Sequence, residues 1–345
     1  MSFRIKGENL LLRKMIKKAG LFFLNKAGVT KVLRSQKKGK VTILNLHRVS
    51  PERDFFFNPM TPGHFESLLK YVSKNYSVVS ISDIFSLTTH HSKSRKPYLV
   101  LSFDDGYYDF VEYALPLLVK YKMPSNHNIV NSCANKNEVI WTHRLNNIFN
   151  QAIERKHDLQ IEIENRSPHF LPENTKNWMK LYSVAFKQLL STPYEQRMKW
   201  ITDKESELST SVSCKMMNWE QIAGCCKFNV EIGSHTYHHD ALATLTDYNS
   251  LLKEIRESKI EIESKLHRPV DVLALPNGQS NENITKACLQ AGLSKILLVD
   301  NKVNNLSDFN PGEINLISRI IISDESPSEM FLRAELFHSK IRKYA

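Results

Sequence analysis

The sequence predicts an α/β protein built around a largely parallel sheet. Short apolar runs with the length and composition of strands alternate with stretches of helical period such as residues 251–266, an order typical of parallel strands joined by helices. The chain of 345 residues is 41% hydrophobic, which is enough to bury a large core. Strands are expected at residues 41–46, 77–81, 98–103, 127–131, 229–233, 270–274, 295–299 and 315–322.

The strand rhythm stops between residues 134 and 217. This stretch is polar and favours helix, most clearly over residues 141–155 and 177–190. We therefore expect residues 134–217 to be a helical insertion within a domain that spans residues 41–323. Residues 324–345 are expected to form a C-terminal helix.

Two polar clusters each follow a predicted strand. Residues 102–106 read Ser-Phe-Asp-Asp-Gly, and residues 234–239 read Ser-His-Thr-Tyr-His-His. An isolated Asp-Asp-Gly is usually a turn, but carboxylates and imidazoles at the ends of strands on one rim would converge on a metal ion. His235 and His239, four residues apart, suit two ligands on one face of a turn, with His238 as the rival to His239.

A metal ion held by these groups would keep a position open for water. Bound zinc lowers the pKa of water from about 15.7 to about 7, so that water becomes a nucleophile. A carboxylate that is not a ligand can take the remaining proton, and the adjacent Asp104 and Asp105 suit this division of labour. The ligand types favour Zn²⁺, and Co²⁺, Ni²⁺ or Fe²⁺ would fit the same donors.

The clusters carry a family resemblance. Residues 102–106 resemble the TFDDG motif of the polysaccharide deacetylases, also called the NodB homology or carbohydrate esterase 4 family, and residues 235–239 fit their H-[ST]-x-x-H motif. Residues 41–49 are similar to the opening strand of the family, and residues 60–65 are similar to the segment that leads to its first helix. The resemblance therefore covers most of residues 41–323. It implies a distorted (β/α)7 barrel of the NodB type, here with a helical insertion and an N-terminal amphipathic helix.

The same resemblance implies roles for individual residues. In the family the first aspartate of the motif is the catalytic base, while the second aspartate and the outer histidines hold the metal. Asp104 is therefore expected to be the base, and the metal ligands are expected to be Asp105, His235 and His239. Supporting or substrate-binding residues are expected to be Gly106, Tyr107, Trp141, Pro276, Asn277 and Arg319.

This sequence departs from the family pattern in two places. The Arg-containing third motif is replaced by residues 274–278, which resemble the Pro-Tyr-Gly loop of a subgroup that includes exopolysaccharide N-deacetylases, with Asn277 in place of Tyr. Arg319 matches an Arg after the last strand of that subgroup and is expected to orient Asp104 by a charge-assisted hydrogen bond. A surface ion pair is the alternative for Arg319.

The second departure concerns the general acid. The Leu-x-His that often supplies it is absent from residues 296–300. His47 matches a His of the subgroup and is the candidate proton donor, because an imidazole beside a metal ion and carboxylates can be protonated; the alternative is that it only stabilises a strand end. A backbone N–H near Tyr107 is expected to stabilise the oxyanion, and Trp141 to stack on a sugar ring or, alternatively, to belong to the core.

All of the net charge lies in an N-terminal arm. Residues 1–40 hold 12 basic residues and one acidic residue, a net of +11 that equals the charge of the whole chain. Interleaved leucines and phenylalanines favour a basic helix on an anionic membrane surface over binding to nucleic acid, and a solvated or self-packing helix is the plain alternative. The apolar run at residues 20–24 is too short for a signal peptide.

Five cysteines in a chain without a secretion signal favour reduced thiols. The expected location is therefore cytoplasmic, peripheral at the inner face of a membrane, which would imply work on a glycan precursor before export. We expect a metal-dependent hydrolase that removes N-acetyl groups from an amino sugar of a surface polysaccharide or its precursor. An O-deacetylase or deformylase with the same centre, or a non-catalytic glycan-binding barrel, is the alternative, and the sequence leaves the oligomeric state open.

Overall fold

The computed structural model describes residues 18–89, 94–136, 138–157, 159, 175–212 and 214–337. Its strands are β1 (Lys40–Leu46), β2 (Ser77–Val78), β3 (Tyr98–Phe103), β4 (Ser125–Ile129), β5 (Val230–Ser234), β6 (Val272–Ala274), β7 (Lys295–Leu297), β8 (Asn304–Asn305), β9 (Asn315–Ile317) and β10 (Ile320–Ile321). They form one sheet in the order β10-β1-β3-β4-β5-β6-β7-β9, with every pairing along this path parallel. Strand β2 joins β3 in parallel, and β8 joins β1 antiparallel.

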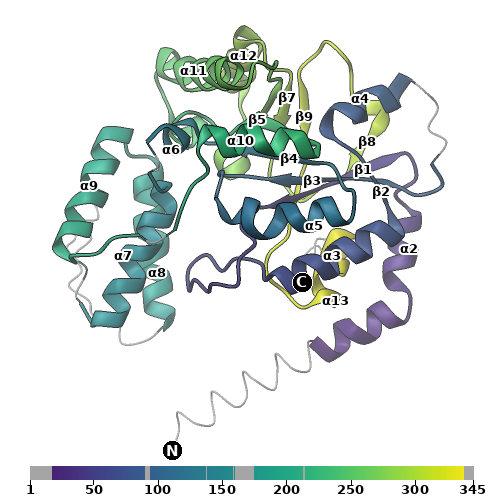
Figure 1. The fold of residues 1–345 in the computed structure, drawn as a ribbon, viewed down its shortest axis with the longest axis horizontal. Coiled ribbons are helices and arrows are strands. Elements are labelled where there is room, and N and C mark those ends of the chain that lie inside the picture. Colours follow the sequence, from purple (N-terminus) through teal and green to yellow (C-terminus); the bar gives the residue numbers. More distant parts are fainter. Residues whose placement is uncertain are drawn as a thin grey trace, which may run out of the picture.

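Helices cover the sheet and extend from one side of it. They are α2 (Val29–Ser35), α3 (Pro62–Asn75), α4 (Ile81–Thr89), α5 (Leu115–Lys120), α6 (Asn131–Lys136), α7 (Trp141–Arg155), α8 (Thr175–Leu190), α9 (Tyr194–Glu207), α10 (Trp219–Cys225), α11 (Tyr248–Leu266), α12 (Glu282–Ala291) and α13 (Pro327–Ala334). Figure 1 shows α11 and α12 at the top of the view, α3 and α5 below strands β3 and β4, and α7 to α9 as a group to the left.

The sheet is a nearly closed barrel. Strand β9 pairs with β7 and strand β10 pairs with β1, so the two ends of the sheet belong to one continuous segment. Only Ser318 and Arg319 separate these two strands. The predicted distorted barrel is confirmed, but the single strand expected at residues 315–322 is wrong, because the chain bends there to pass from one edge of the sheet to the other.

Helices α7 to α9 pack around an apolar cluster that they share with a few rim residues such as Tyr107 and Val130. Leu145, Phe149 and Ile201 are fully buried in it, and the cluster is separate from those that line the barrel. The helix expected at residues 141–155 is found with those bounds, and the one expected at 177–190 starts two residues earlier. The polar stretch after β4 therefore forms a compact helical layer attached to the barrel.

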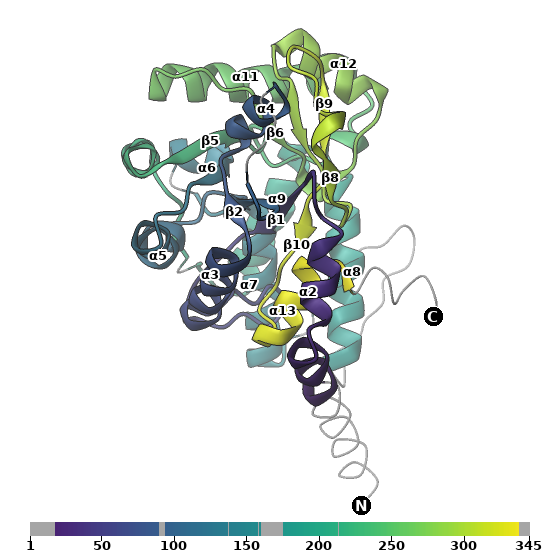
Figure 2. The same cartoon turned by 90° about the vertical axis from the view of Figure 1, so that its right-hand side faces the viewer.

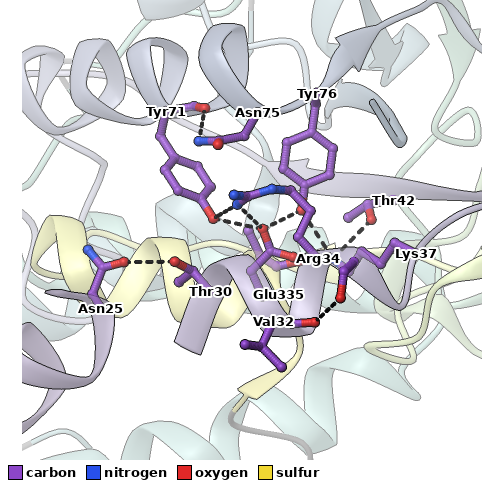
Figure 3. A network of polar contacts seen from close by, with 12 residues as sticks. Asn25, Thr30, Val32, Arg34, Lys37, Thr42, Tyr71, Asn75, Tyr76 and Glu335 are labelled. Carbon is purple, nitrogen blue, oxygen red and sulfur yellow. Dashed lines mark hydrogen bonds and ion pairs between the residues drawn. The ribbon is translucent and has the colours of Figure 1, made fainter. Parts of the chain in front are cut away.

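A buried polar network ties the N-terminal segment to the C-terminal helix (Figures 2 and 3). Glu335, directly after α13, pairs with Arg34 at 3.2 Å and with Lys37 at 3.1 Å. The hydroxyls of Tyr71 and Tyr76 donate to the same carboxylate at 2.7 and 2.6 Å. Burial lowers the pKa of Lys37 against the opposing effect of Glu335. The network fixes α2 against α3 and α13.

Only part of the predicted N-terminal arm can be compared with the structure. Residues 18–26 are helical and α2 follows, whereas residues 1–17 lie outside the described part of the chain. Residues 338–345 of the predicted C-terminal helix lie outside it as well. Among the described residues, no helix is both long and apolar enough to span a bilayer.

Candidate active site

The ends of three strands bring the predicted groups together. His47 follows β1, Asp104 and Asp105 follow β3, and His235 follows β5. Parallel strands end at the same rim, so side chains placed there can converge. These four residues and His239 line one cavity of about 430 Å³.

Asp105, His235 and His239 have the spacing of metal ligands. Oδ1 of Asp105 lies 3.4 Å from Nε2 of His235 and 3.5 Å from Nε2 of His239. Bonds of about 2.1 Å to a tetrahedral zinc ion would place its ligand atoms about 3.4 Å apart. Nδ1 of His235 donates to the carbonyl of Ala274 at 2.9 Å, which leaves the Nε2 lone pair directed toward Asp105. These donors fit a divalent transition metal.

The backbone is unusual around this group of three side chains. Asp105 has φ 80°, Thr236 has φ 65° and His239 has φ 59°, all in the left-handed region. This region costs an L-residue roughly 1–2 kcal/mol, and it is especially unfavourable for a β-branched threonine. The N–H of Thr236 donates to Ser234 Oγ at 3.1 Å, which helps hold the turn. Strain of this kind persists where the surrounding structure fixes side-chain directions, as a metal site requires.

Asp104 is buried and held by two donors. Its Oδ1 accepts hydrogen bonds from Asn128 at 2.7 Å and from Arg319 at 2.8 Å, and no described residue donates to its Oδ2. Burial acts to raise the pKa of Asp104, but the charges of Arg319 and His235 outweigh it and lower the pKa below its usual range. Arg319 is 0% exposed, so the surface ion-pair alternative is wrong. Asp104 is therefore an ionised carboxylate with one oxygen left for a proton.

The side chains of Asp105, His235 and His239 influence one another's ionisation. Burial opposes ionisation of Asp105, but its contact with His235 lowers its pKa to about 2. Burial disfavours the charged form of His235, yet Asp104 and Asp105 raise its pKa overall. Burial and the charge of His235 lower the pKa of His239 to about 3. The triad thus attracts positive charge, which a metal cation would supply in place of the His235 proton.

Two further predicted residues line the cavity. The ring of His47 makes an edge-to-face contact with Phe57 at 5.3 Å. Asn277 also lines the cavity, and its φ is 60°. Gly278 follows it with φ 68°. A Cβ at Gly278 would lie 2.4 Å from the backbone nitrogen of Val299, so only glycine fits there.

The structure decides between the two roles considered for Trp141. This side chain is 2% exposed, and its Nε1 donates to the carbonyl of His239 at 3.2 Å. It cannot offer a face to a sugar ring, and the core alternative is right. Other aromatic side chains of the helical layer, Tyr182 and Phe186, line the cavity instead. His238 is directed to Glu254 at 2.5 Å and is not part of the triad.

The remaining predicted residues occupy supporting positions. Gly106 has φ 90° in the turn after β3. Tyr107 is 1% exposed and its ring lies 4.9 Å from the Arg48 guanidinium. Pro276 is buried beneath the loop that carries Asn277.

The sequence profile described as polysaccharide deacetylase matches residues 91–296. The chain belongs to the polysaccharide deacetylase family. Membership makes this protein a carbohydrate deacetylase and confirms the resemblance inferred from residues 102–106 and 235–239. No curated protein matches the deacetylase chain significantly.

Solved structures with the same fold share little sequence with this deacetylase. Deacetylase PplD of Streptococcus pyogenes, in complex with acetate, is 16% identical with a TM-score of 0.56, covering 86% of this chain and 98% of its own. IcaB from Ammonifex degensii is 15% identical with a TM-score of 0.55, covering 86% and 97%. A de-N-acetylase from Aggregatibacter actinomycetemcomitans is 18% identical with a TM-score of 0.53, covering 85% and 100%.

Sequence reasoning missed Asn128, which lies in β4 and donates to Asp104 Oδ1. It also gave no role to Ser102, whose Oγ accepts a hydrogen bond from Arg319 at 3.1 Å. A Cβ at Gly233 would lie 2.3 Å from Asn128 Oδ1, so that glycine makes room for the amide. The signal was present in the sequence, because strand β4 reads Ser-Asn-His-Asn-Ile, and a fully buried parallel strand is normally apolar.

Proposed function

We propose that this protein is a metal-dependent N-deacetylase that hydrolyses the acetamido group of an N-acetylated amino sugar in a glycan. The proposal depends mainly on one observation: an ionised, buried Asp104 lies next to a triad whose donor atoms are 3.4 and 3.5 Å apart. Metal-assisted hydrolysis of an amide uses these two parts, a cation site and a separate base. Two structural relatives, a deacetylase in complex with acetate and a de-N-acetylase, support the acetyl group as the target.

Asp105, His235 and His239 would hold the metal ion. When bound, a divalent cation polarises the amide carbonyl and lowers the pKa of water. Oδ2 of Asp104 takes the proton of the attacking water, while Arg319 and Asn128 fix the position of Oδ1. Their two hydrogen bonds keep the carboxylate from rotating and keep it ionised.

Two groups of the rim complete the proton and charge transfers. No described residue accepts a hydrogen bond from the backbone N–H of Tyr107, which follows the Asp-Asp-Gly turn and is suited to stabilise the developing oxyanion. His47 lines the same cavity and donates a proton to the departing amine nitrogen. The C–N bond then breaks, leaving acetate and a free amino sugar.

The test is acetate release from N-acetylglucosamine oligomers, measured together with metal content. We expect one equivalent of metal and metal-dependent release of acetate. A metal-loaded protein that hydrolyses only O-acetyl or N-formyl groups would replace the N-deacetylase with the corresponding esterase or deformylase. A pure protein that binds no metal and releases no acetate would support the non-catalytic alternative.

The helical layer supplies one wall of the substrate cavity. Asn146, Tyr182 and Phe186 line it opposite the barrel residues, and the Tyr182 hydroxyl donates to Asn146 Oδ1 at 2.6 Å. Aromatic rings beside an amide are suited to a sugar, whose faces are apolar and whose hydroxyls form hydrogen bonds. We assign the sugar ring to this wall.

We also propose that the N-terminal arm binds an anionic membrane surface. Phe22 and Phe23 are 50% and 69% exposed on the helix that contains Lys18 and Lys26. Exposed aromatic rings among lysines suit the boundary between lipid headgroups and acyl chains. Flotation with phosphatidylglycerol vesicles tests this. Joint Phe22→Ser and Phe23→Ser substitutions should reduce binding, whereas Phe228→Ser, at a residue 48% exposed elsewhere, should not. Equal binding by all three proteins would overturn the proposal.

A further inference from the structure

The two metal-binding histidines are oriented in different ways. Nδ1 of His235 is hydrogen-bonded to the carbonyl of Ala274 in the barrel. Nδ1 of His239 is buried and has no hydrogen-bond partner among the described residues. A ligand histidine usually depends on its second nitrogen for orientation, so His239 must be held by other contacts.

Those contacts come from the helical layer. Trp141, the first residue of α7, donates from Nε1 to the backbone carbonyl of His239 at 3.2 Å. This bond fixes the peptide that follows a residue with φ 59°, a conformation that the chain would otherwise leave readily. The direction of the His239 side chain therefore depends on where α7 places the indole.

Arg197 of α9 also contacts the turn that carries His239. Its side chain is 1% exposed and forms an ion pair with Asp240, the residue next to His239. Its guanidinium also lies 4.8 Å from the ring centre of Trp141. One buried cation thus contacts both the ligand loop and the indole that donates to it, which couples α7 and α9 to a single turn of the barrel rim.

The residue before His239 is held in the same way. The ring of Tyr194, at the start of α9, lies 3.9 Å from the ring of His238. Nδ1 of His238 contacts Glu254 of α11, and the Glu254 carboxylate also accepts from the N–H of His238 at 3.0 Å. The turn that carries His239 is therefore clamped between the helical layer and a barrel helix.

We propose that helices α7 and α9 of the helical layer hold His239 in the position that metal binding requires. Trp141 and Arg197 are then positioning residues that set metal affinity through His239. This inference rests on the proposed metal site but concerns a different part of the protein. Loss of an outer partner of a metal ligand typically lowers metal affinity about 10–100-fold, and we expect an effect of that size from either residue.

The test is Co²⁺ affinity of the full-length protein, measured by competition with a chelator, together with the visible spectrum of the bound ion. Trp141→Phe removes the N–H donor and keeps the ring. It should weaken Co²⁺ binding about 10-fold or more and change the spectrum. Arg197→Lys, which keeps the charge but loses the planar contact with the indole, should weaken binding in the same direction.

Arg144→Met is the matched control. Arg144 joins α7 to α9 through Glu205 at 2.9 Å and does not contact the ligand turn. It should lower the unfolding temperature and leave Co²⁺ affinity unchanged. If Trp141→Phe binds Co²⁺ like the wild type, or if Arg144→Met weakens binding equally, the positioning role is overturned while the metal site stands. A wild-type protein that binds no Co²⁺ would instead overturn the proposed function.

Discussion

The two ends of the candidate site are built by different parts of the molecule. At one end, Asp104 is held by Asn128 of β4 and by Arg319 between β9 and β10, both from the barrel. At the other end, His239 is held by Trp141 and, through its neighbour, by Arg197, both from the helical layer. The proposed base is thus part of the sheet scaffold, whereas one proposed metal ligand depends on an attached set of helices.

This difference predicts that turnover and metal binding can be altered separately. Hydrogen bonds from a closed sheet fix a side chain through the most rigid part of a fold. The helical layer packs on the rim through an apolar cluster that includes Tyr107 and Val130. Among the described residues, both hydrogen bonds to the Asp104 carboxylate come from the barrel, so the layer can influence metal occupancy separately from the base. Changes at the barrel end should alter turnover, and changes at the other end should alter metal binding.

The largest effect is expected at the barrel end from Asp104→Asn. The amide cannot take a proton from water, and loss of a general base typically costs about 10²–10⁴-fold in rate. Metal content should stay at the wild-type level because Asp105, His235 and His239 are unchanged. Acetate release and metal analysis on the same preparation check this. Retained turnover, or loss of metal with turnover, would contradict the assignment of Asp104 as base.

The next largest effect is expected from Arg319→Met, and it should appear as a loss of unfolding free energy. It leaves Asp104 buried without its cation, which typically costs about 3–5 kcal/mol. The control is Arg53→Met, whose partner is Asp324 at 2.7 Å but whose side chain is 50% exposed; exposed pairs contribute about 1 kcal/mol or less. Denaturant unfolding measures both. Equal losses for the two variants would show that burial of the Arg319 pair does not matter.

The pH dependence of stability probes the interior of the barrel at His127, which is not itself a proposed metal ligand. His127 in β4 is 0% exposed, and burial lowers its pKa to about 4 from the ordinary 6.5, although Asp104 and Asp105 act to raise it. Between these values the unfolded chain binds the proton and the folded chain does not. Stability should therefore fall as the pH drops from about 6.5 to about 4, by up to about 3 kcal/mol from this group.

Substitution shows whether His127 causes that slope. His127→Phe should flatten the dependence of unfolding free energy on pH over this range. Asn substituted for the exposed His267, at a φ of 52° that asparagine tolerates, should leave the slope unchanged. A slope that persists in His127→Phe would assign the titration to another group.

The smallest effect is expected in the substrate wall of the helical layer. Tyr182→Phe removes the hydroxyl that donates to Asn146, a bond worth about 1 kcal/mol, and should raise KM a few-fold with little change in kcat. Tyr248→Phe, which removes an exposed hydroxyl bonded to Gln290, is the control and should change neither constant. A fall in kcat alone for Tyr182→Phe would place this residue with the reacting groups and not with the substrate wall.

The candidate catalytic and metal-binding residues could be predicted from the sequence more fully than the residues that hold them in place. Asp104, Asp105 and the two histidines were recognisable because their types and positions after apolar runs suffice to predict a rim cluster. The partners of Asp104 were only partly visible: Arg319 was expected from the family resemblance, but Asn128 lay within a run predicted simply as a strand. Hydrogen bonds between strands far apart in sequence depend on register, which apolar patterning does not specify.

The fold shows the same division. Long amphipathic helices such as α7 and α11 were predictable because their period repeats over several turns. The bend between β9 and β10 was not, because residues 315–322 read as one continuous strand and only closure of the sheet breaks it. The two alternatives for Trp141 stayed open in the sequence for a related reason. A sequence shows that an aromatic residue lies in a helical insertion, but its burial depends on how the helices pack.

The most direct test of the central claim is anomalous diffraction from crystals of the protein loaded with Zn²⁺ or Co²⁺. The account predicts one peak within about 2.0–2.2 Å of Asp105 Oδ1 and of the Nε2 atoms of His235 and His239. A second group of acidic and histidine side chains, His238, Asp240 and Glu254, is the built-in rival site. A peak only at that rival group, or none at the triad in metal-saturated crystals, would contradict the account.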